Sequence, residues 1–131
     1  MDDLKELLKG YETGLIGEKS CRDYIKFKGH KFFQADTISI SPTGNIYLWE
    51  AKHQEKYNAP PFDGHGLPVW QFNMRMEFYQ LTKIRPILYI LEKPTNDIYI
   101  QFFDVLYHGE KFITRTGKRI IFPIESFIKK T

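Results

Sequence analysis

The stretch from Asp36 to Lys52, DTISISPTGNIYLWEAK, decides the fold of this chain. Residues 36–41 alternate polar with apolar side chains, and residues 46–52 begin with β-branched and aromatic side chains. Both patterns are typical of β-strands. Between them lies Pro42-Thr43-Gly44-Asn45, a strong turn signal. The stretch therefore predicts two antiparallel strands joined as a hairpin.

The hairpin brings charged side chains together at its open end. Residues two apart in a strand share a face, so Glu50 and Lys52 point the same way. A tight turn centred between residues 43 and 44 places Asp36 opposite Glu50 or Ala51, and a shift of one residue makes the partner Glu50. Two adjacent carboxylates repel each other unless a proton or a cation lies between them.

A divalent cation gives these residues a chemical purpose. Mg²⁺ or Mn²⁺ takes oxygen ligands, usually one or two carboxylates with water and phosphate. The ion would acidify a bound water, and Lys52 would position that water or neutralise the phosphate. The set predicts a phosphodiesterase site. The alternative is an exposed cross-strand salt bridge worth about 0–1 kcal/mol.

Upstream of the hairpin the pattern is helical. Leu4, Leu7, Leu8 and Tyr11 recur at the spacing of one helix face. A second helix is predicted over residues 16–27, with Gly29 as its C-terminal cap, and a short strand over residues 31–34.

Downstream, residues 53–68 are predicted to form a loop, and residues 69–83 a helix. The apolar stripe of that helix is Trp70, Met74, Phe78 and Leu81. The remaining elements are predicted as strands over 86–91 and 98–107, a hairpin over 112–122 turning near 116–117, and a closing helix over 123–130.

The order of elements indicates an α/β fold in which helices flank a central mixed sheet. At 131 residues, the length predicts one domain spanning residues 1–131. The single cysteine, Cys21, excludes an internal disulfide and fits a reducing compartment.

The hairpin resembles the signature of the PD-(D/E)xK nuclease superfamily. Asp36 is followed after 13 residues by Glu50-Ala51-Lys52, although Ala35 stands where the superfamily name has Pro. The resemblance extends upstream to Gly14-Leu15-Ile16-Gly17-Glu18, which is similar to the Gly-x-x-Gly-Glu helix opening of many members. It extends downstream to a glutamine on the next helix, for which Gln71 is a better match than Gln80. The last 40 residues show no such likeness.

The resemblance implies a restriction-endonuclease-like central mixed sheet flanked by helices. It also implies that Asp36, Glu50 and the backbone carbonyl of Ala51 hold a Mg²⁺ or Mn²⁺ ion. Glu18 would reach the metal, in many members through a water molecule, and Lys52 would position the nucleophile. The alternatives are a surface glutamate for Glu18 and a solvated helix position for Gln71.

These residues predict a metal-dependent endonuclease that hydrolyses DNA, structure-selective and belonging to repair, recombination or phage replication. RNA stays open as a substrate, because the metal chemistry suits either backbone. Cutting both strands with so small a domain predicts a homodimer. One alternative is a non-catalytic nucleic-acid-binding module that retains the nuclease fold. Another is a protein-interaction domain in which the charged set is a coincidence.

Charge and composition are compatible with this function. The net charge is +3, and residues 18–35 and 98–131 form two basic stretches around a slightly acidic middle. No apolar run is long enough to cross a membrane, so we expect an intracellular, cytoplasmic protein, with phage origin in a bacterial host left open. Lys56, Tyr57 and Arg75 are interpreted either as solvated surface residues or as further contacts for phosphate.

The histidines do not have the spacing of a zinc site. They are interpreted as surface or loop residues, and a supporting role at the site stays open for His53, which follows Lys52. The histidines are His30, His53, His65 and His108.

Overall fold

The chain divides into two compact units, residues 1–34 and residues 35–131, and each is described by itself in this computed structural model. In the first unit Gly29 has a φ of +79°, as expected for the predicted helix cap. The predicted strand over residues 31–34 and the candidate ligands Glu18 and Asp36 lie outside the described residues. The structure describes residues 5–6, 20, 23–24, 27–29, 37–58 and 62–130.

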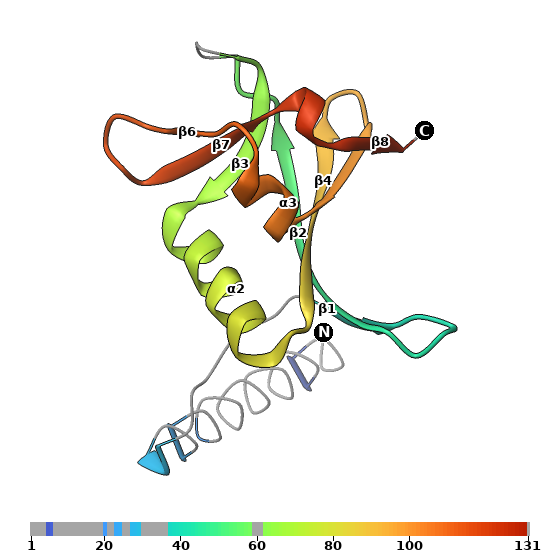
Figure 1. Ribbon diagram of the computed structural model, residues 1–131, viewed down its shortest axis with the longest axis vertical. Coiled ribbons are helices and arrows are strands. Elements are labelled where there is room, and N and C mark those ends of the chain that lie inside the picture. Colours follow the sequence, from blue (N-terminus) through green and yellow to red (C-terminus); the bar gives the residue numbers. More distant parts are fainter. Residues whose placement is uncertain are drawn as a thin grey trace. The chain divides into compact units, whose positions relative to one another are not determined.

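A five-stranded mixed sheet forms the larger part of the second unit (Figure 1). Its strand order is β1-β2-β4-β5-β8, in which β2 and β4 are parallel and all other neighbours are antiparallel. The strands are β1 (Thr37–Ile40), β2 (Ile46–Glu55), β4 (Arg85–Lys93), β5 (Ile98–Phe102) and β8 (Ile128–Lys130).

A second sheet has three strands in the order β3-β7-β6, all antiparallel. The expected α/β class with a mixed sheet is therefore confirmed, and the three-stranded sheet is an addition to it. Its strands are β3 (Gly64–Pro68), β6 (Phe112–Ile113) and β7 (Arg119–Pro123). The helices of this unit are α2 (Val69–Thr82), α3 (Phe103–His108) and the 3-10 turn η1 (Ile124–Ser126). Among the described residues, no helix has the length and apolarity needed to cross a membrane.

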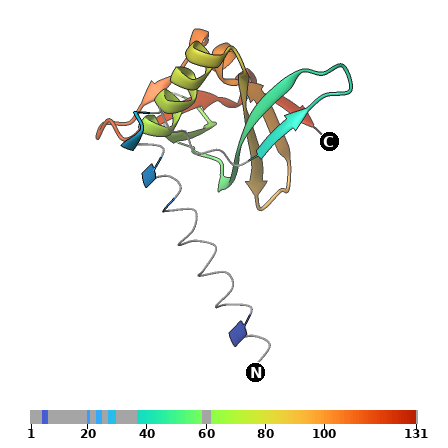
Figure 2. The same cartoon turned by 90° about the horizontal axis from the view of Figure 1, so that it is seen from below.

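The predicted hairpin is confirmed as the pair β1–β2. Thr37 lies opposite Trp49, and Gly44 turns the chain with a φ of +89°. This register is the one that an Asp36–Glu50 pairing requires, although the described pairing ends at Thr37. The hairpin projects from the rest of this unit in two perpendicular views (Figures 1 and 2).

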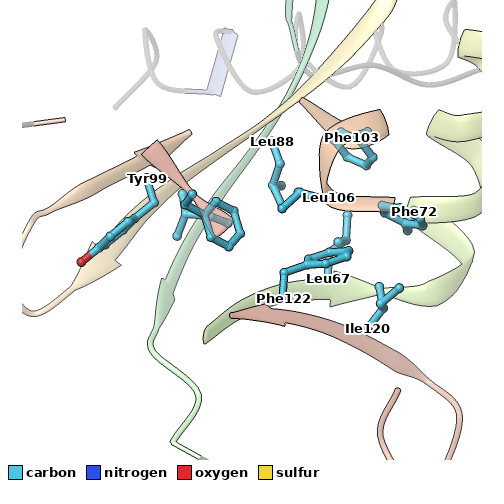
Figure 3. Close-up of a cluster of buried hydrophobic side chains, with 10 residues drawn as sticks. Leu67, Phe72, Leu88, Tyr99, Phe103, Leu106, Ile120 and Phe122 are labelled. Atoms are coloured by element: carbon cyan, nitrogen blue, oxygen red, sulfur yellow. The ribbon is translucent and has the colours of Figure 1, made fainter. Parts of the chain in front are cut away.

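One hydrophobic core joins both sheets and both helices. Side chains from β3, β4, α2, α3 and β7 point toward one another in Figure 3. Phe72 of α2 stacks on Phe103 of α3 at 5.4 Å between ring centroids. The core residues are Leu67, Phe72, Leu88, Ile90, Tyr99, Phe103, Leu106, Ile120, Phe122 and Phe127.

The predicted loop over residues 53–68 is wrong at both ends. Strand β2 continues to Glu55, and β3 starts at Gly64. Strand β3 has the sequence GHGLP. Glycine and proline are depleted in strands, so this sequence does not predict one. Its glycines are required because a Cβ at Gly64 or Gly66 would collide with carbonyl groups of β7.

Two C-terminal predictions are also wrong in part. The predicted strand over residues 98–107 ends at Phe102, and α3 follows because Phe103 and Leu106, three residues apart, both enter the core. The predicted closing helix over residues 123–130 is only the turn η1 followed by β8. The predicted hairpin near Gly117 is confirmed as β6–β7.

Helix α2 forms as predicted but buries a different face. Trp70 and Leu81, from the predicted apolar stripe, are each 62% exposed. The fully buried positions are Phe72 and Arg75, which are also three residues apart. Helix α2 therefore places the charged side chain of Arg75 against the sheet, where it contacts Glu50 of β2.

We expect Gly66→Ala to destabilise the fold by about 1–3 kcal/mol, because the new Cβ would press on the backbone of Ile120 in β7. Gly109→Ala is the matched control, since its Cβ would meet only atoms at ordinary van der Waals distances. Urea denaturation of both variants measures the difference. Equal stabilities would show that the close β3–β7 approach is not required.

Candidate functional site

Glu50 lies on β2 and is buried, with 4% of its surface exposed. Its Oε2 atom accepts hydrogen bonds from Arg75 Nη2 at 2.9 Å and from Arg75 Nε at 3.3 Å. Arg75, on α2, is itself only 3% exposed. A buried carboxylate is costly unless it is paired, and Arg75 supplies that pairing. Arg75 is thus an internal residue, whereas the sequence suggested a surface contact for phosphate.

Lys52 extends the pair into a cluster. Its ammonium lies 3.5 Å from Glu50 Oε1 and donates a hydrogen bond of 2.6 Å to Gln71 Oε1. Its side chain is 24% exposed, so it connects the buried pair with solvent. The structure therefore brings together three of the predicted site residues, which are Glu50, Lys52 and Gln71. We call these three residues and Arg75 the Glu50 cluster.

The choice between the two helix glutamines is settled by position. Gln71 lies in the first turn of α2, where it reaches Lys52. Gln80 is exposed near the opposite end of the helix. Of the two candidate glutamines, Gln71 is therefore the one that contacts Lys52.

The charges of the Glu50 cluster do not balance. One carboxylate faces two cationic side chains, and Arg75 Nη1 is buried without a hydrogen-bond partner among the described residues. A buried, unpartnered guanidinium nitrogen is costly and calls for an acceptor. A phosphate oxygen or a second carboxylate has that chemistry.

A divalent metal would find one available oxygen in this part of the site. Arg75 engages Glu50 Oε2, which leaves Oε1 facing Lys52. No group of three or more His, Cys, Asp or Glu side chains with metal-binding geometry occurs within residues 37–58 and 62–130 or the other described positions. Since Mg²⁺ uses as few as one or two carboxylates, Glu50 Oε1 fits such a site together with a further oxygen ligand, and the candidates Asp36 and Glu18 lie outside the described residues.

The other polar candidates lie away from the Glu50 cluster. Residues alternate along β2, so His53 is exposed on the opposite side from Lys52. Lys56 pairs with Asp63 at 3.8 Å, both partly exposed. The guanidinium of Arg119 lies 5.7 Å from the centre of the Tyr57 ring.

A second polar cluster was not anticipated from the sequence. His65, interpreted as a surface or loop residue, is completely buried on β3. Its Nε2 lies 2.7 Å from Glu92 Oε2 on β4, and its Nδ1 lies 3.1 Å from Gln54 Oε1 on β2. The histidine therefore links the three-stranded sheet to two strands of the five-stranded sheet.

The backbone of Gly66 determines where the protons of His65 lie. Gly66 N–H donates to Gln54 Oε1 at 3.2 Å, and Gly66 carbonyl oxygen accepts from Gln54 Nε2 at 3.0 Å. These contacts fix the amide, so His65 Nδ1 must donate to Oε1. A second proton then lies between Nε2 and Glu92. Burial lowers the pKa of His65, and the hydrogen bond to Glu92 acts in the opposite direction.

His65, at the centre of this second cluster, is completely buried, whereas Gln54 is half-buried. The purpose of the cluster is to join the sheets. The only signals in the sequence are single residues spread over three strands, with no spacing that predicts their contact.

Replacing one partner of the Glu50–Arg75 pair should lower the free energy of unfolding more than replacing both partners. We expect Glu50→Leu and Arg75→Leu each to lower the free energy of unfolding by roughly 3–5 kcal/mol, because each leaves a buried charge without its closest partner. The double variant should lose less than the sum of the two. Urea denaturation of all four proteins measures the coupling, and the partly exposed pair Lys56–Asp63 is the control, with about 0–1 kcal/mol. Additive losses would contradict a buried ion pair.

His65→Leu should cost roughly 3–5 kcal/mol, because the Glu92 carboxyl stays buried without its partner. His53→Leu, at an exposed position of β2, should change stability by less than about 0.5 kcal/mol. Thermal and urea unfolding of the two variants give the comparison. Similar stabilities would mean that the link between the sheets contributes little.

Comparisons of this chain with protein-family models, with curated proteins and with solved structures found no match.

Proposed function

We propose that this protein is a divalent-metal-dependent nuclease that hydrolyses DNA phosphodiester bonds on a restriction-endonuclease-like domain of the PD-(D/E)xK type. The observation that carries the proposal is the hydrogen bond of 2.6 Å between Lys52 and Gln71, with Glu50 3.5 Å from the same ammonium. Strand β2 of the hairpin and helix α2 supply these residues, and β4 then pairs parallel to β2. The residue types at this spacing are those that metal-assisted phosphodiester hydrolysis uses.

Asp36, Glu50 through Oε1, and the backbone carbonyl of Ala51 would hold Mg²⁺ or Mn²⁺. When bound, the ion would supply a water of lowered pKa and stabilise negative charge on the leaving oxygen. A Glu50 carboxylate whose Oε2 is engaged by Arg75 is held in one orientation, which suits it to present Oε1 to a cation.

Lys52 would act on the phosphate and on the attacking water. Its ammonium is held on one side by Gln71 and on another by Glu50, and its side chain remains partly exposed. An ammonium held in place costs little reorganisation when charge develops on the phosphate. Gln71 is then a positioning residue, since its amide oxygen orients Lys52.

The excess positive charge of the cluster supports an anionic substrate. Lys52 and Arg75 together outweigh Glu50, and Arg75 Nη1 is buried without an acceptor among the described residues. A phosphate approaching Lys52 would balance that charge. The proposed enzyme acts as a homodimer, because two sites are needed to cut both strands.

A cleavage assay tests the proposal. We expect the full chain to cleave labelled linear, flap or four-way-junction DNA with Mg²⁺ and to lose activity in EDTA. Lys52→Gln should lower the rate about 100-fold or more, as removal of one electrostatic contact to the transition state does. Lys93→Gln, at an exposed position of β4, is the control and should cleave normally.

Metal binding gives a readout independent of activity. Calorimetric titration with Mn²⁺ should show binding to the wild-type protein and a marked loss in Asp36→Asn, whereas Glu55→Gln, at an exposed position of β2, should bind normally. Equal affinity in all three proteins would contradict the ligand assignment.

A specific observation favours one alternative, a non-catalytic nucleic-acid-binding module that retains the fold. Glu50 is already neutralised by Arg75, as a carboxylate without a metal would need to be. Tight DNA binding without cleavage at any Mg²⁺ or Mn²⁺ concentration would establish that alternative.

A further inference from the structure

A groove opens where the start of α2 meets the turn between β6 and β7. Its volume is about 630 Å³. It is separate from the Glu50 cluster in its lining, yet Trp70 of the groove directly precedes Gln71 in α2. The lining residues are Pro68, Val69, Trp70, Asn73, Gly117, Lys118 and Arg119.

Trp70 gives the groove an open aromatic surface. The side chain is 62% exposed, although tryptophan is usually largely covered. Trp49, the other tryptophan of the chain, is half-buried and donates a hydrogen bond of 2.7 Å to Ser39. Asn73 follows Trp70 by nearly one helical turn and brings an exposed amide to the same groove.

The opposite wall of the groove is basic. Residues 111–123 contain four basic side chains and no acidic one. Lys118 and Arg119, two of the four, line the groove itself. Within the described part of the chain, no carboxylate forms an ion pair with either of them. An apolar peptide would leave these charges unmatched, whereas a phosphodiester backbone would match them.

We propose that this groove binds an unpaired nucleotide of single-stranded DNA, with the base stacked on Trp70 and the phosphates at Lys118 and Arg119. An aromatic ring beside cationic side chains is the combination that binds single strands independently of sequence. A paired base is stacked inside the duplex, so its face is not available to Trp70.

One part of this proposal rests on the proposed nuclease function, namely the expectation of which DNA substrates are cut best. Because Trp70 and Gln71 are consecutive, a strand held in the groove passes close to the residue that orients Lys52. The substrates expected to be cut best are therefore duplexes with a single-stranded flank, such as flaps and frayed ends.

Fluorescence of the full chain tests the binding step. In a Trp49→Phe background, Trp70 is the one tryptophan left, and titration with oligothymidylate in EDTA should quench its emission. Trp70→Ala should weaken binding of a labelled oligothymidylate roughly 5- to 150-fold, the range that loss of one stacked base produces. Lys118→Gln should lower the salt dependence of binding by about 0.7 in log–log slope.

Two matched controls separate this groove from general effects. Leu81→Ala removes an equally exposed apolar side chain from the same helix, and Lys130→Gln removes an exposed cation from β8. Both should bind oligothymidylate as the wild-type protein does. Unchanged emission on titration, or equal losses in Trp70→Ala and Leu81→Ala, would overturn the proposal. Tighter binding of oligouridylate than of oligothymidylate would overturn the assignment to DNA.

The cleavage and fluorescence experiments distinguish a failure of the nuclease proposal from a failure of the groove proposal. If Trp70 emission responds and no DNA is cut with Mg²⁺, the groove proposal stands and the nuclease proposal fails. If blunt duplex is cut while Trp70 emission does not respond, the nuclease proposal stands and the groove proposal fails. If both hold, Trp70→Ala should lose the preference for flanked substrates and keep the rate on blunt duplex.

Discussion

The parallel pairing of β2 with β4 is the constraint on which the rest of the second unit depends. Parallel neighbours cannot be joined by a tight turn, so the chain must leave the sheet and return before it can pair again. Helix α2 lies within that crossover. Because the helix packs against β4, its first two turns face the middle of β2, where Glu50 and Lys52 share one side. The Glu50 cluster is thus a consequence of the crossover.

Burial then determines the chemistry of that cluster. Glu50 is only 4% exposed, and a carboxylate at that depth requires a positive partner. Arg75 fulfils this need with two hydrogen bonds to one oxygen, while the other oxygen faces Lys52. The result is a carboxylate with a fixed orientation beside a partly exposed ammonium. This arrangement is compatible with the proposed metal site and also with a site that only binds phosphate.

The two sheets are joined by the buried contact between His65 and Glu92 and by the shared core. His65 bridges β3 to β4 through Glu92 and to β2 through Gln54. The close approach of β3 to β7 requires glycine, and the same glycine, Gly66, fixes the amide of Gln54. A segment that looks like a flexible loop in the sequence is therefore among the most tightly constrained in the structure.

Local patterns were sufficient for the hairpin over residues 36–52, for helix α2 and for the buried strand β4, because alternation, turn residues and apolar runs act within a few residues. The hairpin pattern also singled out Glu50 and Lys52, and the family resemblance singled out Gln71, three residues that lie together in the structure. Strand β3, the buried face of α2 and the partners of Glu50 and His65 were decided only by tertiary structure. Each depends on contacts between residues far apart in the sequence, such as Arg75 with Glu50. A charged residue in a helix looks like surface until a buried carboxylate from another strand is placed against it.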